Sequence, residues 1–457
     1  MTVSTIISSL PRRHAVVRES SPGGAVPLPR PLTHPLSTGR AERRDDVGRG
    51  RPWRWSTLRG TFVRSGALHA LSGSLWRSVF ALRRGADGVA VPEGFTSRVV
   101  ARSGERTGGV TWHASPGDGA CFPEDEGWIY VSNSGVALLG GVTALRFASD
   151  GGLRDAYRIL SGTDLNRSGT ATPWHTWLSC EQTAVGQVFE CDPYGTRAPM
   201  PRLGMGLFRH HGIVGDPDRE VFYLTEAEPD GCLYRFRPDD WGDLTTGVLE
   251  VMVGEPGAEE VDWARVPSPA APARPLRDQV KGARRFDRGE ACHYSGGVCH
   301  IVTRGDGRVW AYDTRHERVR VAAGPGESTG RPGGQEGLFL AGDPGVTEIT
   351  VVVPGGAAEP FLRVDGPAGG MEDARISGLA FSPDGTRLYF SCRRPTSPRV
   401  PVRRGGAGPV EAGVTYEVAG PFRERLRAAT GIDDAAGETA DETAAQAAAQ
   451  TAGGAAG

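Results

Sequence analysis

The chain has 457 residues, of which 38% are hydrophobic, and a formal net charge of -2 at pH 7. This charge excludes a general electrostatic attraction to nucleic acid or to an anionic membrane, so we expect any charged partner to meet a local site. The 66 glycines and 34 prolines exclude a mainly helical protein. We therefore predict a mainly β protein with no nucleic-acid partner and no stable insertion into a membrane.

The first 60 residues are rich in proline and arginine and lack periodicity, which predicts a disordered extension. Residues 54–86 contain "RWSTLRGTFVRSGALHALSGSLWRSVFA", which is similar to a twin-arginine export signal. The signal is degenerate because Trp55 stands where the second arginine belongs and Arg64 and Arg77 interrupt the apolar stretch. We expect an exported protein if this signal works and a cytoplasmic one otherwise. No segment reaches the roughly 18 apolar residues of a transmembrane helix.

A pair of strand-like runs recurs six times after this region. The centres of the first runs are Tyr130, Trp177, Tyr223, His300, Phe339 and Tyr389. Four of the five spacings are 39 to 50 residues, close to the length of a propeller blade. We interpret the segment from Asp239 to Pro269 as an insertion between blades three and four, which explains the longer spacing. A β-sandwich would not need six similar pairs, so we predict an all-β, six-bladed β-propeller over 91–422 and a disordered tail over 430–457.

In a propeller, the strand nearest the axis of each blade delivers side chains to a central funnel. We expect the first run of each pair to be this strand. That arrangement places the following polar residues around one opening: Asn133, Cys180, Glu181, Glu226, Asp306, Asp343 and Arg393. The alternative is that these residues simply face solvent, as polar residues at strand ends usually do.

Carboxylates that converge on one axis raise each other's pKa unless a cation neutralises them, so the funnel predicts a metal site. The predicted ligands are Cys180, Glu181, Glu226, Glu290, Asp306, Asp343 and His210, with His211 as a second nitrogen donor. Oxygen ligands suit calcium, whereas a Cys180 thiolate favours iron or zinc. For Cys180 the alternative is an ordinary buried cysteine, since the seven cysteines form no C-x-x-C pair. The sequence has no G-x-S-x-G elbow, Walker-type loop or H-E-x-x-H helix.

Several motifs resemble those of the PhoX-type alkaline phosphatases and their uncharacterised exported relatives. Among them are "GWIYVSNS", "TPWHTWLSCEQ", "FYLTEAEPDGCLYRFRPD", "RGEACHY" and "SGLAFSPDGTRLYFS", in the family's order between Val91 and Phe422. The resemblance implies a six-bladed propeller with iron and calcium in its funnel, hydrolysis of phosphate monoesters, and export by the twin-arginine route. It also implies that Cys180 is a thiolate ligand of iron and that the carboxylates of Glu181, Glu226 and Glu290 are metal ligands.

Four positions that are usually acidic in the family are neutral or imidazole here. They are Gly135, Gln182, His211 and Gly342. Because fewer carboxylates weaken a calcium site, two hypotheses follow. The first is a monomeric PhoX-like phosphatase, weakened by the lost acids, that acts on a small phosphorylated substrate. The second is a catalytically silent propeller that binds a ligand or a protein. A third hypothesis is a lactonase-like metal-dependent hydrolase, but no motif in the sequence supports it.

Overall fold

The structure is a computed structural model that describes residues 5–6, 82–270, 273–323, 338–341, 347–352, 358–365, 374–395 and 411–430. The described strands fall within one unit. The expected disorder of 1–60, the expected signal before residue 82 and the expected tail after residue 430 lie outside the described residues. In the described part of the chain, no helix is both long enough and apolar enough to cross a membrane.

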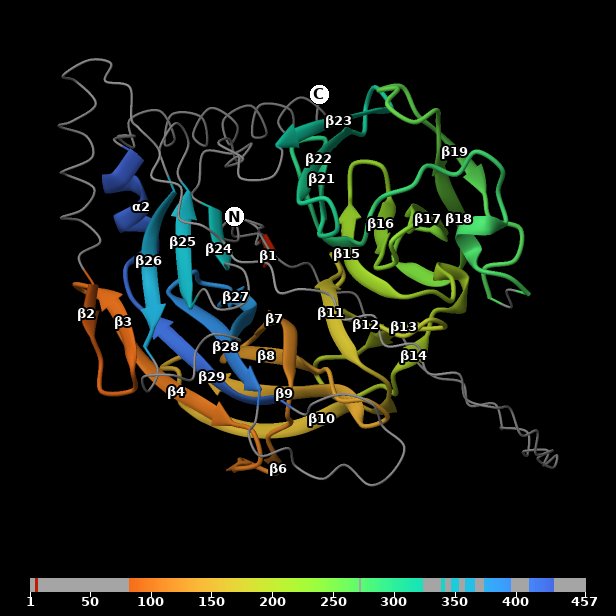
Figure 1. The fold of residues 1–457 in the computed structure, drawn as a ribbon. Helices are drawn as coiled ribbons and strands as arrows, with labels where there is room; N and C mark the ends of the chain where they lie inside the picture. Colours follow the sequence, from red (N-terminus) through yellow and green to blue (C-terminus); the bar gives the residue numbers. More distant parts are fainter. Residues whose placement is uncertain are drawn as a thin grey trace, which may run out of the picture. The chain divides into compact units, whose positions relative to one another are not determined.

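The fold is all-β, with six antiparallel sheets of at least four strands (Figure 1). The first sheet has the strand order β10 (Leu153–Thr163), β9 (Gly140–Ala148), β8 (Gly127–Ser134), β7 (Pro116–Glu124). The second has the order β11 (Asn166–Ala171), β12 (Trp177–Glu181), β13 (Val188–Cys191), β14 (Met200–Pro201). The third has the order β15 (His210–Asp216), β16 (Val221–Glu226), β17 (Leu233–Asp240), β18 (Asp243–Val253), β19 (Asp262–Arg265). Consecutive strands are neighbours in these sheets, so each sheet is a meander.

Two of the remaining three sheets combine strands from both ends of the described chain. The fourth sheet has the order β20 (Gly289–Ser295), β21 (Val298–Thr303), β22 (Arg308–Asp313), β23 (Arg318–Ala323). The fifth has the order β1 (Thr5–Ile6), β24 (Leu338–Ala341), β25 (Glu348–Val352), β26 (Ala358–Val364), β3 (Val89–Pro92), β2 (Leu82–Arg84). The last has the order β27 (Arg375–Phe381), β28 (Arg387–Pro395), β29 (Glu411–Ala419), β4 (Thr96–Arg102). Other elements are β5 (Arg106–Thr107), β6 (Val110–Thr111), η1 (Leu203–Met205), η2 (Leu276–Asp278) and α2 (Phe422–Thr430). The pairings β26–β3 and β29–β4 join the two ends.

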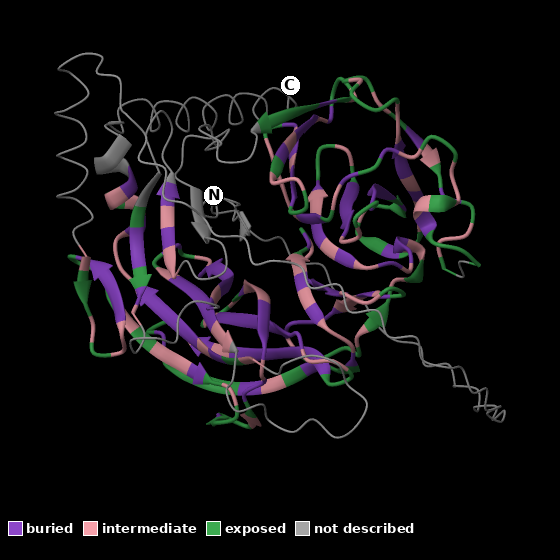
Figure 2. Cartoon of the chain, viewed as in Figure 1, coloured by how far each residue is buried: buried purple, intermediate pink, exposed green. Residues whose placement is uncertain are grey.

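The six strand pairs expected from the sequence are present as antiparallel hairpins. They are β8–β9, β12–β13, β16–β17, β21–β22, β24–β25 and β28–β29. The expectation that the first member of each pair is the first strand of its sheet is wrong, because another strand precedes it in every sheet. The strands of these pairs include some that are buried at every position, such as β12 and β16 (Figure 2). By contrast, β11 alternates between buried and more accessible positions, and β20 is mainly intermediate.

The segment from Asp239 to Pro269 is a continuation of the third sheet and not a separate insertion. It supplies the end of β17 and the whole of β18 and β19. Leu249, Val251 and Met252 of β18 are buried. Trp263 of β19 also donates its indole N–H to the hydroxyl of Tyr312 on β22, at 2.9 Å. The extra strands therefore bury apolar surface and connect the third sheet to the fourth.

The apolar core lies between the faces of neighbouring sheets. One cluster combines Leu178 and Val188 of the second sheet with Phe222 and Tyr234 of the third. Another combines Trp128 of the first sheet with Tyr389 of the last, and the Trp128 indole N–H donates to the Tyr389 hydroxyl at 3.0 Å. Because both faces of the second strand in each sheet are covered in this way, the polar residues at the ends of these strands are held in fixed positions.

Candidate functional site

Five sheets begin with a strand that we call an edge strand: β7, β11, β15, β20 and β27. Each edge strand runs antiparallel to the second strand, so its start lies opposite the end of that strand. The facing pairs are Pro116 with Ser134, Asn166 with Glu181, His210 with Glu226, Gly289 with Thr303 and Arg375 with Arg393. Contacts join β7 to β27 and β11, β11 to β15, and β15 to β20. The starts of the five edge strands are therefore neighbours.

Glycines allow the edge strands to approach one another closely. A Cβ atom on Gly117 would lie 2.4 Å from the carbonyl oxygen of Arg167, and one on Gly378 would lie 2.6 Å from that of Gly117. At Gly212, the corresponding distance to the carbonyl oxygen of Glu290 is 2.5 Å. These distances are shorter than a side chain tolerates, so glycine is required where β7, β15 and β27 meet their neighbours.

Charged side chains gather at these strand starts. The residues, which we call the strand-start cluster, are Asp118, Arg167, His211, Glu290, Arg375, Arg393 and Glu411. Arg393 Nη1 donates to Glu411 Oε2 at 3.2 Å, and the side chains of this pair are only 11% and 15% exposed. His211 Nε2 lies 3.9 Å from Glu290 Oε1. The Asp118 carboxylate accepts a hydrogen bond from the backbone N–H of Gly169 on β11.

Burial shifts the pKa values of this cluster. Burial raises the pKa of Asp118 to about 6, although the Arg393 guanidinium opposes the shift. The pKa of Arg393 is lowered to about 10 by burial and then by the nearby guanidinium of Arg167. Burial also lowers the pKa of His211 to about 4, and Arg167 and Arg304 act in the same direction. His211 is therefore neutral at pH 7, and Asp118 titrates close enough to neutral pH to exchange a proton.

The Cys180 and Glu181 side chains lie one strand away from this cluster, on β12. Cys180 is fully buried in the apolar cluster between the second and third sheets, and burial raises the pKa of its thiol. Glu181 accepts the backbone N–H of Asp164 at 2.8 Å and that of Gln187 at 3.0 Å. These hydrogen bonds connect the backbone at Asp164 and at Gln187 to β12.

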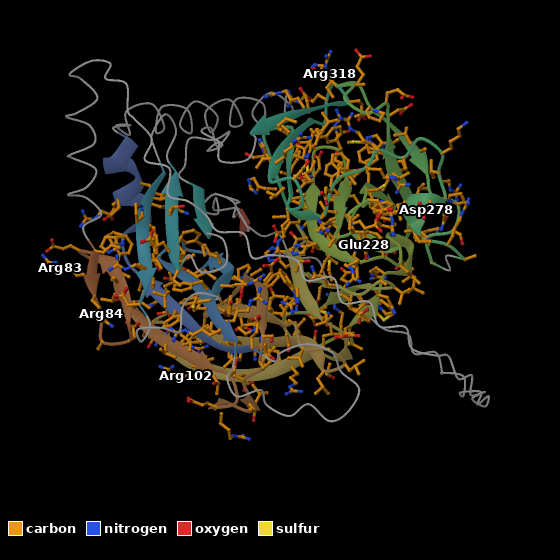
Figure 3. All side chains as sticks on the ribbon, in the orientation of Figure 1. Arg83, Arg84, Arg102, Glu228, Asp278 and Arg318 are labelled. Carbon is orange, nitrogen blue, oxygen red and sulfur yellow. The ribbon has the colours of Figure 1, made fainter. Side chains whose placement is uncertain are left out.

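Glu226 is the most buried of the predicted carboxylates, with a side chain that is 1% exposed. Its Oε1 accepts Arg277 Nη1 at 2.7 Å, while Oε2 accepts the Tyr234 hydroxyl at 2.9 Å and the Cys232 N–H at 3.2 Å. Arg277 lies on η2, the element that also carries the Asp278 labelled in Figure 3. The Glu226 carboxylate therefore has a cationic partner and two further donors within the chain.

The remaining predicted ligands are dispersed. Asp306 accepts the Thr303 hydroxyl at 2.5 Å and pairs with Arg308 at 3.5 Å. His210 is fully buried with Nε2 3.1 Å from the carbonyl oxygen of Gly206. Glu290 belongs to the strand-start cluster, and Asp343 lies outside the described residues. His210 is the first residue of the edge strand β15, but of the seven predicted ligands only Glu290 belongs to the strand-start cluster.

Residues 139–345 match the family model described as "Alkaline phosphatase PhoX". The chain is similar to the PhoX family over this segment, which is less than half of its length. No curated protein matches the chain in sequence. The match begins at the β8–β9 connection and ends after β24. It therefore includes β11, β15 and β20 of the edge strands, whereas β7 and β27 lie outside it.

Several solved structures have a weaker, structural likeness to this chain. A nidogen/laminin complex covers 58% of this chain and 84% of its own, with 13% identity and a TM-score of 0.37. A putative gluconolactonase covers 74% and 97%, with 12% identity and a TM-score of 0.35. The pyranose dehydrogenase PQQ domain from Coprinopsis cinerea covers 74% and 98%, with 10% identity and a TM-score of 0.38. These scores are too low to transfer a property of these proteins to this chain.

The PhoX family implies metal dependence, but the described residues do not fit a metal ion. Among them, no three His, Cys, Asp or Glu side chains form a group that could hold one. Cys180 is fully buried in the apolar cluster between the second and third sheets, and the Glu226 carboxylate is paired with Arg277. At the strand starts, the guanidiniums of Arg167 and Arg393 would repel a cation. The geometry therefore favours an anion at this place over a metal ion.

Sequence reasoning named Glu290, Arg393 and His211 but missed Asp118, Arg167, Arg375 and Glu411. Asp118 and Arg167 lie on the edge strands β7 and β11, whose sequences "PGDGACFPE" and "NRSGTA" lack a strong hydrophobic pattern. A signal was present nonetheless: β7, β11, β15 and β27 each carry a glycine within three residues of a charged or imidazole side chain near their start. Searching for such a strand before each apolar pair would have found Asp118, Arg167 and Arg375.

Proposed function

We propose that this chain binds phosphate monoesters and that its hydrolytic activity is weak. The family match over residues 139–345 is the observation that carries the substrate class. The strand-start cluster supports it, because guanidinium groups are well suited to phosphate oxygens. The proposed ligand is thus a small phosphorylated molecule, bound by a monomer.

We also infer that the six sheets are the blades of a six-bladed β-propeller. Three features support this architecture: the meander order, the contacts between successive edge strands, and the pairing of β4 with β29. In a propeller, a strand from one end of the chain commonly completes the last blade, which leaves the edge strands around a central opening. The strand-start cluster would then line one mouth of that opening.

We expect weak hydrolysis because carboxylates that were predicted to bind metal already have hydrogen-bond partners within the chain. The Glu226 carboxylate is paired with Arg277, and both oxygens of Glu181 accept backbone N–H groups. A second function, the catalytically silent binding protein, is favoured by this same observation. Iron and calcium as cofactors, ligation by Cys180 and export of the chain remain predictions of the family resemblance.

One experiment separates these functions. The full chain is purified, its iron and calcium are measured by elemental analysis, and hydrolysis of p-nitrophenyl phosphate is followed with added metals and with a chelator. Slow, chelator-sensitive turnover supports the weak phosphatase. Absence of bound metal and of turnover after supplementation leaves only the silent binding protein. A Cys180→Ser variant that keeps its iron and its turnover would exclude Cys180 as a ligand.

A further inference from the structure

We propose that Arg167, Arg375 and Arg393 form an oxyanion site that binds the phosphate group of the ester directly, without a metal ion. The inference rests on the proposed function, because it names the residues that would bind the anionic phosphate group of the proposed substrate. The three arginines come from different strands: Arg167 is the second residue of β11, Arg375 is the first residue of β27 and Arg393 faces Arg375 on β28. None of them belongs to the metal-ligand set predicted from the sequence.

Packing of the edge strands brings these arginines to one place. The Ser377 hydroxyl on β27 donates to the carbonyl oxygen of Pro116 on β7 at 3.0 Å. On the other side of β7, Asp118 accepts the N–H of Gly169 from β11. Strand β7 therefore holds β27 and β11 on its two sides, and each of these strands has an arginine among its first two residues.

The guanidiniums are incompletely paired within the described part of the chain. Arg393 has an ion pair with Glu411, whereas Arg167 and Arg375 have no described carboxylate within 4.0 Å. Arg167 and Arg375 are nonetheless partly buried. Burial lowers the pKa of Arg167, the more distant Glu411 carboxylate opposes this shift, and Arg375 adds to it. Like charges held together in a site of reduced solvation are destabilising unless an anion joins them.

The balance of charge selects an oxyanion. Among the described residues, four guanidiniums act on this region, those of Arg167, Arg304, Arg375 and Arg393. The described carboxylates are those of Asp118, Glu290 and Glu411. The resulting excess of positive charge favours an anion, and the planar fork of arginine matches the oxygens of a phosphate dianion. The imidazole of His211, with Nε2 3.9 Å from Glu290 Oε1, offers a further hydrogen-bonding group beside them.

The test is a titration of the full chain with inorganic phosphate and with phenyl phosphate, followed by calorimetry at low salt. We expect Arg375→Gln and Arg167→Gln each to weaken phosphate binding at least tenfold. Arg320→Gln, an exposed arginine on β23, is the matched control and should leave the affinity unchanged. Binding should also weaken as salt rises, because the attraction is mainly between charges.

The stability of the variants checks that lost binding is not lost folding. Since Arg375 has no described ion-pair partner, Arg375→Gln should unfold at the same temperature as the wild type or higher in the absence of phosphate. Equal phosphate affinity in the wild type and in both arginine variants would overturn the site. Chelator-sensitive hydrolysis without phosphate binding to the arginines would also overturn it, while leaving the proposed phosphatase function intact. Phosphate binding without hydrolysis would support the site and exclude the phosphatase.

Discussion

Arg277 Nη1 lies 2.7 Å from Glu226 Oε1, and the Glu226 side chain is 1% exposed. Removing one partner of such a pair leaves a buried charge without compensation. We expect Arg277→Gln to lower the free energy of unfolding by about 3 kcal/mol, measured by chemical denaturation. Arg285→Gln is the control, because its pair with Asp278 is 40% and 45% exposed and should contribute about 0.5 kcal/mol.

The double variant Glu226→Gln/Arg277→Gln separates charge from packing. With both charges removed, the buried site no longer holds an unpaired carboxylate, so much of the lost stability should return. A double variant less stable than Arg277→Gln alone would contradict this account. It would mean that the Glu226 carboxylate stabilises the fold mainly through Tyr234 and Cys232, whose donors it also accepts.

Acid should destabilise the protein through its buried histidines. Burial lowers the pKa of His210 to about 4 and that of His113 to about 3. Because these folded-state values lie below the usual value of 6.5, stability is fully present above pH 6.5 and is lost as the pH falls towards 4. For His210 the loss is on the order of 3 kcal/mol. Denaturation of wild type and His210→Gln between pH 7.5 and 4.5 should show a shallower pH dependence in the variant; parallel curves would contradict the assignment.

Gly378 should be sensitive to substitution for two reasons. Its φ of +67° is unfavourable for other residues, and an added Cβ would lie 2.6 Å from the carbonyl oxygen of Gly117. Gly104 has a φ of +84° but open space around the added Cβ, so it isolates the backbone effect. We expect Gly104→Ala to cost about 1 kcal/mol and Gly378→Ala about 3 kcal/mol in the free energy of unfolding. Equal losses would mean that β27 moves away from β7 at no cost.

The sequence predicted the hairpins well but not the strands that hold the site. Runs such as that around Tyr130 and Tyr223 were recognised because burial on both faces makes them apolar along their whole length. Edge strands such as β7 and β11 have glycines and charged residues instead, so their hydrophobic pattern is weak. The pairing of Glu226 with Arg277, 51 residues further on, depends on tertiary packing that no local pattern reveals.

The central claim is that phosphate is held by arginines at the edge-strand starts. The most direct measurement is a crystal structure of the full chain soaked with tungstate, whose anomalous signal locates a phosphate-like oxyanion. We predict one strong peak within hydrogen-bonding distance of the Arg167, Arg375 and Arg393 guanidiniums, and its absence in Arg375→Gln. A peak beside Cys180, Glu181 and Glu226, or no peak at the strand starts, would contradict the claim.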